Sequence, residues 1–456
     1  MWQGIKNIYH LANAILANLW FGFPSRSLTV IGVTGTDGKT TTVSLIYHIL
    51  HTVGYNASMI SSVGAIIGGK NYDVGFHVTT PSPWALQRFI KKAVQGSPRL
   101  LNDSSSARGP VAPSSHPMSS VASSLRALDG TPSSRATPRS RFLILETTSH
   151  ALDQYRVFGI KFDVGVLTNV THEHLDYHKT YENYVKTKAN LLEMARIAVV
   201  NRDDESYKTI SNIKYKISNI SKNKKWITYG MDSNADVNPK NSSFRSRLIG
   251  EFNKYNILAA IAVCRSLKIN DSIIRKSILN FKPPIGREEV VYKNSFTVMV
   301  DFAHTSNAFE QILSSLRPNI KGRLIHVFGA AGERDATKRP LMGKTSAKYS
   351  DIIVLTSEDP RSEPVEKIME EIALGAQSSK LKAQSYSSKL KTKDDKNLVF
   401  KIPDRQEAIN VAIKMAKKGD FILITGKAHE RSMNYGKGEE PWDEFEAVKK
   451  ALRLRS

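Results

Sequence analysis

Residues 28–40 read LTVIGVTGTDGKT, and this stretch decides how the rest of the chain is interpreted. An apolar run typical of a buried strand leads into a glycine-rich turn that ends in lysine and threonine. Gly35 and Gly38 allow backbone N–H groups to surround phosphate oxygens, Lys39 can reach the outer phosphates, and the Thr40 hydroxyl can ligate magnesium at a helix start. The stretch therefore predicts a nucleotide site, with an ordinary glycine turn between a strand and a helix as the alternative.

The length and composition of the chain are those of a globular enzyme. Its 456 residues are too many for one hydrophobic core, so we expect two domains. Hydrophobic residues make up 41% and charged residues 23%, which excludes a disordered or membrane-embedded chain. The single cysteine, Cys264, excludes an internal disulfide and lies in an apolar helical run, so we expect a buried thiol and a cytoplasmic location.

The net charge of +23 raises the question of a nucleic-acid partner. Much of the excess is lysine scattered over residues 208–225 and 380–401, without interleaved aromatic residues. We therefore expect no nucleic acid. The charge either attracts anionic substrates or reflects a lysine-rich solvated surface.

The first 27 residues carry apolar side chains at helical spacing, interrupted by polar ones. The apolar run is shorter than the roughly 20 residues that a membrane span needs. We expect an amphipathic helix packed on the following domain, and a signal peptide or surface anchor is the alternative. The residues of the apolar face are Ile5, Ile8, Tyr9, Ala12, Ile15, Leu16 and Leu19.

Strand-like and helical segments alternate along the chain, which predicts α/β domains built on parallel sheets. We expect a central ATP-binding domain with a phosphate-loop parallel sheet over residues 28–282. Residues 96–140 are rich in Ser, Pro, Ala and Arg and predict a disordered insertion in that domain. Two prolines and a glycine in the run 281–287 mark the boundary to a Rossmann-like α/β domain over residues 283–456.

Two further segments carry candidate chemistry. Glu146 ends an apolar strand, and ligands of open parallel sheets bind at the carboxyl ends of strands. A helix cap or surface carboxylate is the other interpretation of Glu146. The run 171–178, THEHLDYH, could bind a transition metal, but its spacing fits no standard zinc pattern and its acids favour magnesium. The helical context of Lys188, taken by itself, predicts that this lysine lies on the solvated surface.

Eight runs together resemble the Mur ligases, in the order and spacing of the tripeptide-synthetase branch of that family. The resemblance covers residues 28–95 and 141–437. The runs are 35–41 (GTDGKTT), 146–152 (ETTSHAL), 168–178 (TNVTHEHLDYH), 184–188 (YVKTK), 250–256 (GEFNKYN), 286–287 (GR), 301–304 (DFAH) and 338–343 (KRPLMG).

The resemblance implies an ATP-dependent, ADP-forming amide ligase of peptidoglycan precursor synthesis. A substrate carboxylate would be activated as an acyl phosphate and then attacked by an amine. Two magnesium ions are implied, with Thr40, Glu146 and His174 as ligands and with Lys188 as a carbamate. The catalytic set would be Lys39, Glu146, His174 and Lys188. The implied ATP-binding residues are Gly35, Thr36, Asp37, Gly38, Lys39, Thr40, Thr41, Asn256, Arg287, Asp301 and His304.

The family's substrate positions can also be found in this chain. Those for the UDP-muramoyl-peptide acceptor are Thr79, Thr80, Thr148, Gln154 and Arg156. Those for the incoming amino acid are Arg334, Glu358, Asp359, Pro360, Arg361, Gly426 and Glu430. Arg361 resembles the arginine of enzymes that add meso-diaminopimelate. The chain departs from the family pattern at Asp37 and Glu358-Asp359, where the family has Asn and Asp-Asn, and at Ala428, where it has Gly.

The family also carries an N-terminal uridine-binding domain, whereas 27 residues precede Leu28 here. We therefore expect this domain to be missing and a partner or the remaining domains to bind uridine. A related ligase acting on another carboxylate, of the folylpolyglutamate or cyanophycin synthetase type, is the alternative. A non-catalytic nucleotide-binding protein is the third. We expect a monomer without a membrane span.

Overall fold

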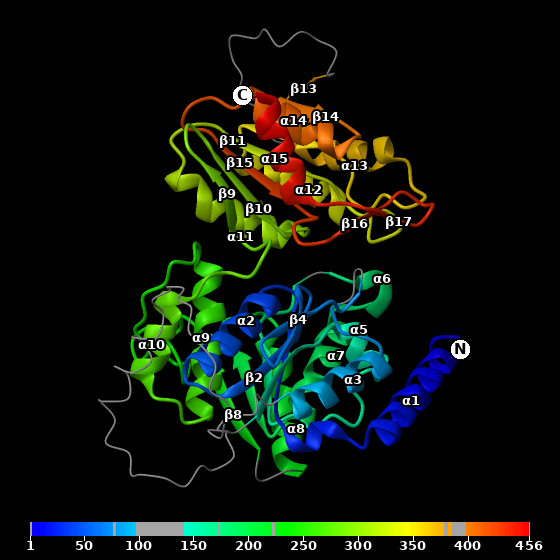
Figure 1. Cartoon of the computed structure of the whole chain (residues 1–456), viewed down its shortest axis with the longest axis vertical. Coiled ribbons are helices and arrows are strands. Elements are labelled where there is room, and N and C mark those ends of the chain that lie inside the picture. Colours follow the sequence, from blue (N-terminus) through cyan, green and yellow to red (C-terminus); the bar gives the residue numbers. More distant parts are fainter. Residues whose placement is uncertain are drawn as a thin grey trace, which may run out of the picture.

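The computed structural model describes residues 2–75, 79–96, 141–171, 173–220, 224–377, 382–384 and 398–455. It contains two α/β units that follow one another along the chain, coloured blue to green and green to red (Figure 1). The predicted α/β class with two large parallel sheets is confirmed. The insertion predicted for residues 96–140 lies, from residue 97 on, outside the described residues.

The first unit is built on a sheet of eight described strands, in the order β4-β3-β2-β5-β1-β6-β7-β8. All pairs from β2 to β8 in this order are parallel, and β3 and β4 extend the sheet as an antiparallel edge. Because β1 lies at the centre with both faces covered, nearly all of its residues are buried. The strands are β1(Thr29–Thr34), β2(Asn56–Ser61), β3(Gly64–Ile67), β4(Lys70–Tyr72), β5(Arg141–Glu146), β6(Val164–Leu167), β7(Ile197–Asn201) and β8(Lys225–Tyr229).

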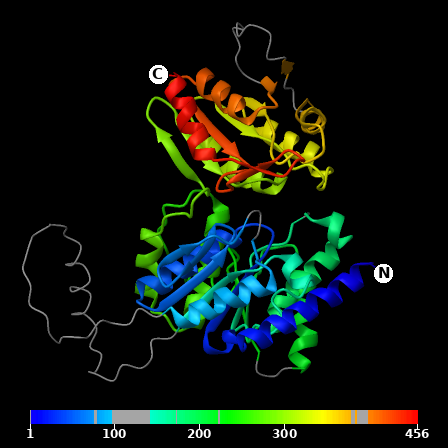
Figure 2. The ribbon, with the colours of Figure 1, turned by 45° about the vertical axis from the view of Figure 1, so that its right-hand side comes forward.

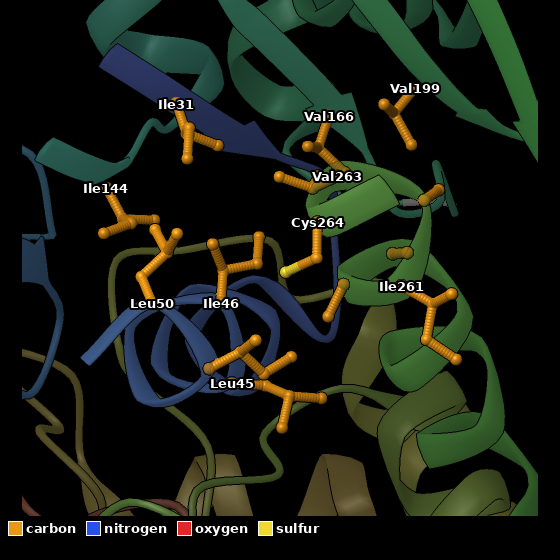
Figure 3. Close-up of a cluster of buried hydrophobic side chains, with 14 of the residues drawn as sticks. Ile31, Leu45, Ile46, Leu50, Ile144, Val166, Val199, Ile261, Val263 and Cys264 are labelled. Carbon is orange, nitrogen blue, oxygen red and sulfur yellow. The ribbon is translucent and has the colours of Figure 1, made fainter. Parts of the chain in front are cut away.

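Successive residues of β1 enter different cores because strand side chains alternate between the two faces of a sheet. Ile31 and Val33 pack with α2 and α9, whereas Leu28 and Val30 pack with α3. Figure 3 shows Cys264 of α9 within the first of these cores, which confirms the predicted buried thiol. The helices of this unit are α1(Trp2–Phe21), α2(Lys39–Thr52), α3(Pro83–Gln95), α5(Ser149–Asp153), α6(Leu175–His178), α7(Tyr181–Met194), α8(Tyr207–Ile220), α9(Glu251–Ser266) and α10(Asp271–Asn280), with the 3-10 turn η1(Pro24–Ser27).

The second unit contains a sheet of seven described strands, in the order β13-β14-β12-β11-β15-β10-β9. Only the edge pair β9 and β10 is antiparallel among the pairings described for this sheet. The strands are β9(Glu289–Lys293), β10(Thr297–Asp301), β11(Leu324–Phe328), β12(Ile352–Leu355), β13(Lys382–Gln384), β14(Leu398–Lys401) and β15(Phe421–Thr425). A separate hairpin follows, β16(Ser432–Asn434) and β17(Glu439–Pro441).

Helices cover both faces of this second sheet, so each face has its own core. Residues from α14 and α15 pack on one face, and residues from α11, α12 and α13 pack on the other. The helices are α11(Ser306–Leu316), α12(Lys338–Tyr349), α13(Val365–Gln377), α14(Arg405–Met415) and α15(Glu444–Arg455), with the 3-10 turn η3(Arg317–Asn319).

Residues 281–288 connect the two units, and Glu288 in this connection forms hydrogen bonds with both units. Its carboxylate accepts hydrogen bonds from Ile249 N (3.0 Å) and from the Asn253 side chain of the first unit. Its own N–H donates to Asp301 of the second unit at 2.8 Å. The connection therefore carries specific contacts in addition to its proline and glycine turns.

The helix α1 forms as expected and contacts α3, but its orientation differs from the prediction. The small side chains of Ala14 and Ala17 and the amide of Asn18 face the unit, whereas Ile8, Tyr9, Ile15, Leu16 and Leu19 are exposed. Asn18 donates to the carbonyls of Ala14 and Phe158, both at 2.8 Å. Small residues permit close backbone approach, so this side packs and the apolar side points outward.

Figures 1 and 2 both draw α1 along the outer side of the first unit. Among the described helices, none is long and apolar enough to cross a bilayer.

Candidate functional site

A cavity of about 1090 Å³ is lined by residues of both units at the carboxyl ends of their parallel strands. Crevices at this edge are the usual ligand sites of open α/β sheets. Most predicted site residues line it: Asp37, Gly38, Lys39, Thr40, Thr41, Thr79, Thr80, Glu146, Thr148, Arg156, His174, Asn256, Arg287, Asp301, His304, Arg334, Glu358, Asp359, Arg361, Gly426 and Glu430. Gly35, Thr36, Gln154, Lys188 and Pro360 are not among the lining residues.

The turn between β1 and α2 has the backbone that a phosphate cradle needs. Gly35 and Gly38 have φ values of 154° and 79°, which residues with a side chain rarely adopt. A Cβ atom at Gly35 would lie 1.8 Å from Thr168 Oγ1, and one at Gly38 would lie 2.2 Å from Asn256 Oδ1. Glycine is therefore required at both positions, and the N-terminus of α2 faces the cavity with its positive dipole end.

Glu146 lies at the carboxyl end of β5, next to the start of α2. Its carboxylate accepts hydrogen bonds from Thr40 Oγ1 at 3.0 and 3.2 Å and from Ser62 N at 3.0 Å. Arg287, from the connection between the units, donates to Thr40 Oγ1 at 3.1 Å. Hydroxyl and carboxylate oxygens side by side are the hard donors that magnesium prefers, so this pair fits the implied ion.

His174 begins the short helix α6 in a left-handed conformation, with φ of 57°. Burial lowers the pKa of His174 to about 3, so the ring is neutral near pH 7 and can offer a lone pair to a metal. Its Nε2 lies 3.8 Å from Glu173 Oε2, and His304 Nε2 lies 3.6 Å from Glu173 Oε1. Among the described residues, which exclude His172, no three His, Cys, Asp or Glu side chains gather as a metal cluster.

Glu173 was not assigned a role from the sequence, although it lies within the histidine-rich run. Burial would raise its pKa, but electrostatic interactions with His174, His304, Lys338 and Lys39 outweigh burial and lower the pKa to about 2. Glu173 is therefore an anion at neutral pH. The side chains of His174, His304 and Lys338, which come from three segments of the cavity wall, lie 3.6–4.0 Å from its carboxylate.

Lys188 is almost fully buried in α7, so the surface position that its local context predicts is wrong. Its Nζ donates to the Gly35 carbonyl at 2.7 Å and lies 4.4 Å from the ring centroid of Tyr184. Burial, and next the charge of Lys39, hold the pKa of Lys188 well below its usual value. A buried amine of this kind is neutral more readily than an exposed one.

Thr80, Thr148 and Arg156 form one connected group on the first unit. Thr80 Oγ1 donates to the Glu146 carbonyl at 3.0 Å and accepts from Thr148 N at 3.1 Å. Arg156 donates to the Thr80 carbonyl at 3.1 Å and to Gln154 Oε1 at 3.0 and 2.7 Å. Gln154 thus orients the guanidinium of Arg156, and only Arg156 of these two lines the cavity.

The opposite end of the cavity is built from charged side chains of the second unit. Lys427 is fully buried, and its Nζ lies 2.9 Å from Asp359 Oδ1 and 2.7 Å from Glu430 Oε2. Asp359 and Arg361 have φ values of 44° and 53°, so their loop adopts a backbone that side chains disfavour. Asp359 Oδ1 also accepts from Asn434 N at 3.0 Å, which ties this loop to β16.

Glu358 lies directly against Gly426, where a Cβ atom would come within 2.4 Å of Glu358 Oε2. Burial raises the pKa of Glu358 to about 8, against the opposing charges of Lys338, Arg405 and Lys427. Glu358 Oε2 is buried without a hydrogen-bond partner among the described residues. Glu358 also lines the cavity, so this oxygen is an unused hydrogen-bond acceptor in its wall.

Asp37, which departs from the family pattern, links the two units. Its Oδ2 accepts a hydrogen bond from Asn307 of α11 at 2.7 Å, while its backbone N–H donates to Asn169 Oδ1 at 2.9 Å. Burial, and next the charge of Glu173, raise the pKa of Asp37. No pattern in the sequence distinguished Asn307, because its role depends on how the units meet.

Comparison with known proteins agrees with this geometry. The Mur ligase middle domain matches residues 33–101 and 131–264, and the Mur ligase, glutamate ligase domain matches residues 286–428. An Aquifex aeolicus UDP-N-acetylmuramoyl-L-alanyl-D-glutamate–2,6-diaminopimelate ligase is 35% identical over 454 residues, covering 96% of this chain and 80% of the relative. The chain belongs to the Mur ligase family. A UDP-N-acetylmuramyl-tripeptide synthetase of a Roseiflexus species is 33% identical over 97% of this chain and 82% of its own length.

Solved Mur ligase structures share the fold. A UDP-N-acetylmuramoyl-L-alanyl-D-glutamate–2,6-diaminopimelate ligase superposes with a TM-score of 0.54 at 24% identity, over 94% of this chain and 79% of the other. Escherichia coli FolC superposes with a TM-score of 0.64 at 16% identity, over 97% and 92% of the two chains. The architecture of two α/β units is therefore shared by this ligase and by FolC.

Proposed function

We propose that this Mur ligase uses ATP to join a diamino acid, meso-diaminopimelate, to the D-glutamate carboxylate of UDP-N-acetylmuramoyl-L-Ala-D-Glu. The observation that carries the proposal is a cavity in which the glycine-rich turn of the first unit faces charged side chains of the second unit. The relative at 35% identity is named as a UDP-N-acetylmuramoyl-L-alanyl-D-glutamate–2,6-diaminopimelate ligase, and the relative at 33% identity as a UDP-N-acetylmuramyl-tripeptide synthetase.

The reaction consists of two steps, transfer of a phosphoryl group to the acceptor and transfer of the acyl group to the amine. An oxygen of the acceptor carboxylate attacks the γ-phosphorus, the bond to the β-phosphate oxygen breaks, and ADP leaves. The amine nitrogen then attacks the acyl carbon, loses a proton, and expels inorganic phosphate as the amide forms. Both steps need crowded negative charge to be neutralised and the reactants to be held in line.

The cradle supplies this neutralisation at the nucleotide end. Backbone N–H groups at the start of α2 and the side chains of Lys39 and Arg287 would surround the phosphates, and both side chains line the cavity. Asn256, Asp301 and His304 line the same cavity and are proposed to contact the nucleotide. Arg287 also bonds Thr40, so it joins the cradle to the connection between the units.

We assign Thr40 and Glu146 as oxygen ligands of magnesium, with the neutral imidazole of His174 as a further ligand. Bound magnesium would withdraw charge from phosphoryl oxygens. We assign Lys188 as a carbamate, because a neutral, buried amine can add carbon dioxide. The modification would exchange a cation for an anion beneath the cradle and favour cation binding nearby.

The acceptor is proposed to lie along Thr79, Thr80, Thr148 and Arg156, with Gln154 holding Arg156 in place. A planar guanidinium binds a carboxylate or phosphate through two parallel hydrogen bonds. This group borders Glu146 through Thr80, so the acceptor carboxylate would reach the γ-phosphate beside the magnesium ligands.

Arg334 and Arg361 are proposed to bind the distal carboxylate of meso-diaminopimelate, and Glu358 its distal ammonium group. Glu430 and Gly426 would complete this pocket, together with the loop of Asp359 and Pro360. Lys427 and Asn434 both bond Asp359 and so fix this loop, which holds Arg361 in a defined position. Lysine lacks the distal carboxylate and should be a poor substrate.

The test is phosphate release from ATP and magnesium with UDP-N-acetylmuramoyl-L-Ala-D-Glu and, in parallel, meso-diaminopimelate, L-lysine or no amine. We expect phosphate release only when both the acceptor and diaminopimelate are present. Mass spectrometry should then detect the tripeptide product. Turnover with a folate or another carboxylate, and none with the muramoyl acceptor, would assign a different acceptor. No turnover with any carboxylate would indicate a nucleotide-binding protein without ligase activity.

A further inference from the structure

The helix α1 presents a continuous apolar face to solvent, which the proposed ligase reaction does not use. At 100° per residue, Ile8, Ile15 and Leu19 lie on one side of this face, and Tyr9, Leu16 and Trp20 lie on the other. Their side chains are 38–76% exposed, with Trp20 the most exposed. A face of this kind on a folded protein marks a site of interaction.

Aromatic rings extend this face onto the neighbouring helix. Trp84 of α3 is 39% exposed, and its ring centroid lies 6.5 Å from Trp20 and 6.2 Å from Phe21. Lys91 Nζ lies 5.7 Å from the Phe21 ring, and the Arg26 guanidinium lies 4.3 Å from the Phe23 ring. Cations therefore border the aromatic end of the α1 face.

The charged side chains of α1 and α3 are all basic. Neither α1 nor α3 contains an aspartate or glutamate, whereas α3 contains Arg88, Lys91 and Lys92. Asp153 is an acidic residue beside α1, and it accepts hydrogen bonds from Tyr177 (2.6 Å) and from Asn7 (3.4 Å). An apolar ridge with a basic border is complementary to a surface that is apolar within and anionic at its edge.

We infer that the exposed face of α1, with Trp84, docks on an anionic phospholipid bilayer. Tryptophan and tyrosine favour the level of lipid headgroups, and lysine and arginine are attracted to anionic headgroups. The helix would lie in the plane of the interface with its apolar side chains among the acyl chains, since it is not long and apolar enough to span. The basic residues of α3 would then contribute part of the net charge of +23 to membrane binding.

This docking is independent of the proposed ligase function, because no residue of α1 lines the cavity described above. A second copy of the chain or a partner protein could also cover an apolar helix. The basic border favours the anionic bilayer over a second copy, since two copies would bring like charges together.

The test is sedimentation of the full chain with vesicles of phosphatidylglycerol and phosphatidylethanolamine, beside vesicles of phosphatidylcholine alone. We expect binding to the anionic vesicles that weakens with added salt, and weak binding to the neutral ones. Leu16→Glu and Trp20→Glu should each reduce binding at least about tenfold, because each places a charge among acyl chains. Trp20→Phe should retain most of it.

The matched control is Leu374→Glu on α13, a leucine of the second unit that is 62% exposed against 55% for Leu16, and this variant should bind as the parent does. Phosphate release without vesicles should be unchanged in all these variants, which shows that they fold. Absence of binding to anionic vesicles would overturn the inference, as would equal binding by the Leu16→Glu variant. A dimer in sedimentation velocity that Leu16→Glu abolishes, without vesicle binding, would assign the face to a second copy.

Discussion

The two ends of the cavity are built in different ways. At the phosphate end, backbone N–H groups, glycines and short side chains form a turn between one strand and one helix. At the opposite end, charged side chains are held by ion pairs between segments far apart in the sequence, such as Lys427 with Asp359. The first end is the proposed nucleotide site, whereas the second is the proposed amino-acid pocket.

The largest effect is expected at Lys188, which lies beneath the phosphate end. Lys188→Ala should abolish turnover, on the order of a thousandfold or more, if a carbamate there supports cation binding. Bicarbonate with a short carboxylic acid should restore part of the rate, measured as phosphate release. The control is Lys186→Ala, an exposed lysine two residues away on the same helix. Full activity of Lys188→Ala would refute the carbamate.

The next largest effect is expected at Arg361, at the opposite end. Arg361→Ala should raise the KM for meso-diaminopimelate by about a hundredfold with a smaller change in kcat, because a buried carboxylate would lose a bidentate partner. Arg361→Lys should recover little of the affinity, since lysine cannot form the two parallel bonds. Arg275→Ala, an exposed arginine on α10, is the control. An unchanged KM for Arg361→Ala would remove this residue from the pocket.

A pH effect is expected at the same end. Burial raises the pKa of Glu358 to about 8, so below this pH a proton must leave before the carboxylate pairs with a substrate ammonium group. The affinity for meso-diaminopimelate, measured by calorimetry, should increase up to about tenfold from pH 7 to pH 9. Titration of the substrate amines is corrected with the Glu358→Gln variant, which should bind more weakly and without this rise. An equal rise in the variant would exclude Glu358 as the cause.

The smallest effect is expected where the two ends are joined, at Asp37 and Asn307. Asn307→Ala removes the hydrogen bond between the units and should lower kcat/KM for ATP by roughly 3- to 10-fold. Asp37→Asn can still accept this bond, so it should cost less than Asn307→Ala. Asn319→Ala, on the exposed turn η3, is the control. A larger loss of kcat/KM in Asp37→Asn than in Asn307→Ala would show that the charge of Asp37, rather than its hydrogen bond to Asn307, supports activity.

The difference between the two ends also explains what the sequence could predict. The cradle could be predicted from residues 28–40 because its geometry is local, set by Gly35, Gly38 and the helix that follows. Lys188 was predicted only through the family resemblance, since its burial depends on contact with Gly35 at a separation of 153 residues. Asn307 was not predicted at all, because its partner Asp37 lies 270 residues away in the sequence.

The orientation of α1 was predicted incorrectly for a related reason. Helical spacing of apolar residues indicates an amphipathic helix but does not specify which side packs. In this fold the side with Ala14, Ala17 and Asn18 is selected, because Asn18 bonds the carbonyl of Phe158 and the alanines allow close approach.

The central claim is that the cradle transfers phosphate to the acceptor carboxylate within this one cavity. The most direct measurement uses UDP-N-acetylmuramoyl-L-Ala-D-Glu with ¹⁸O in the reacting carboxylate, together with ATP, magnesium and meso-diaminopimelate. An acyl phosphate predicts that one ¹⁸O atom appears in each released phosphate and that the new amide keeps the other. Release of phosphate without ¹⁸O would contradict the account.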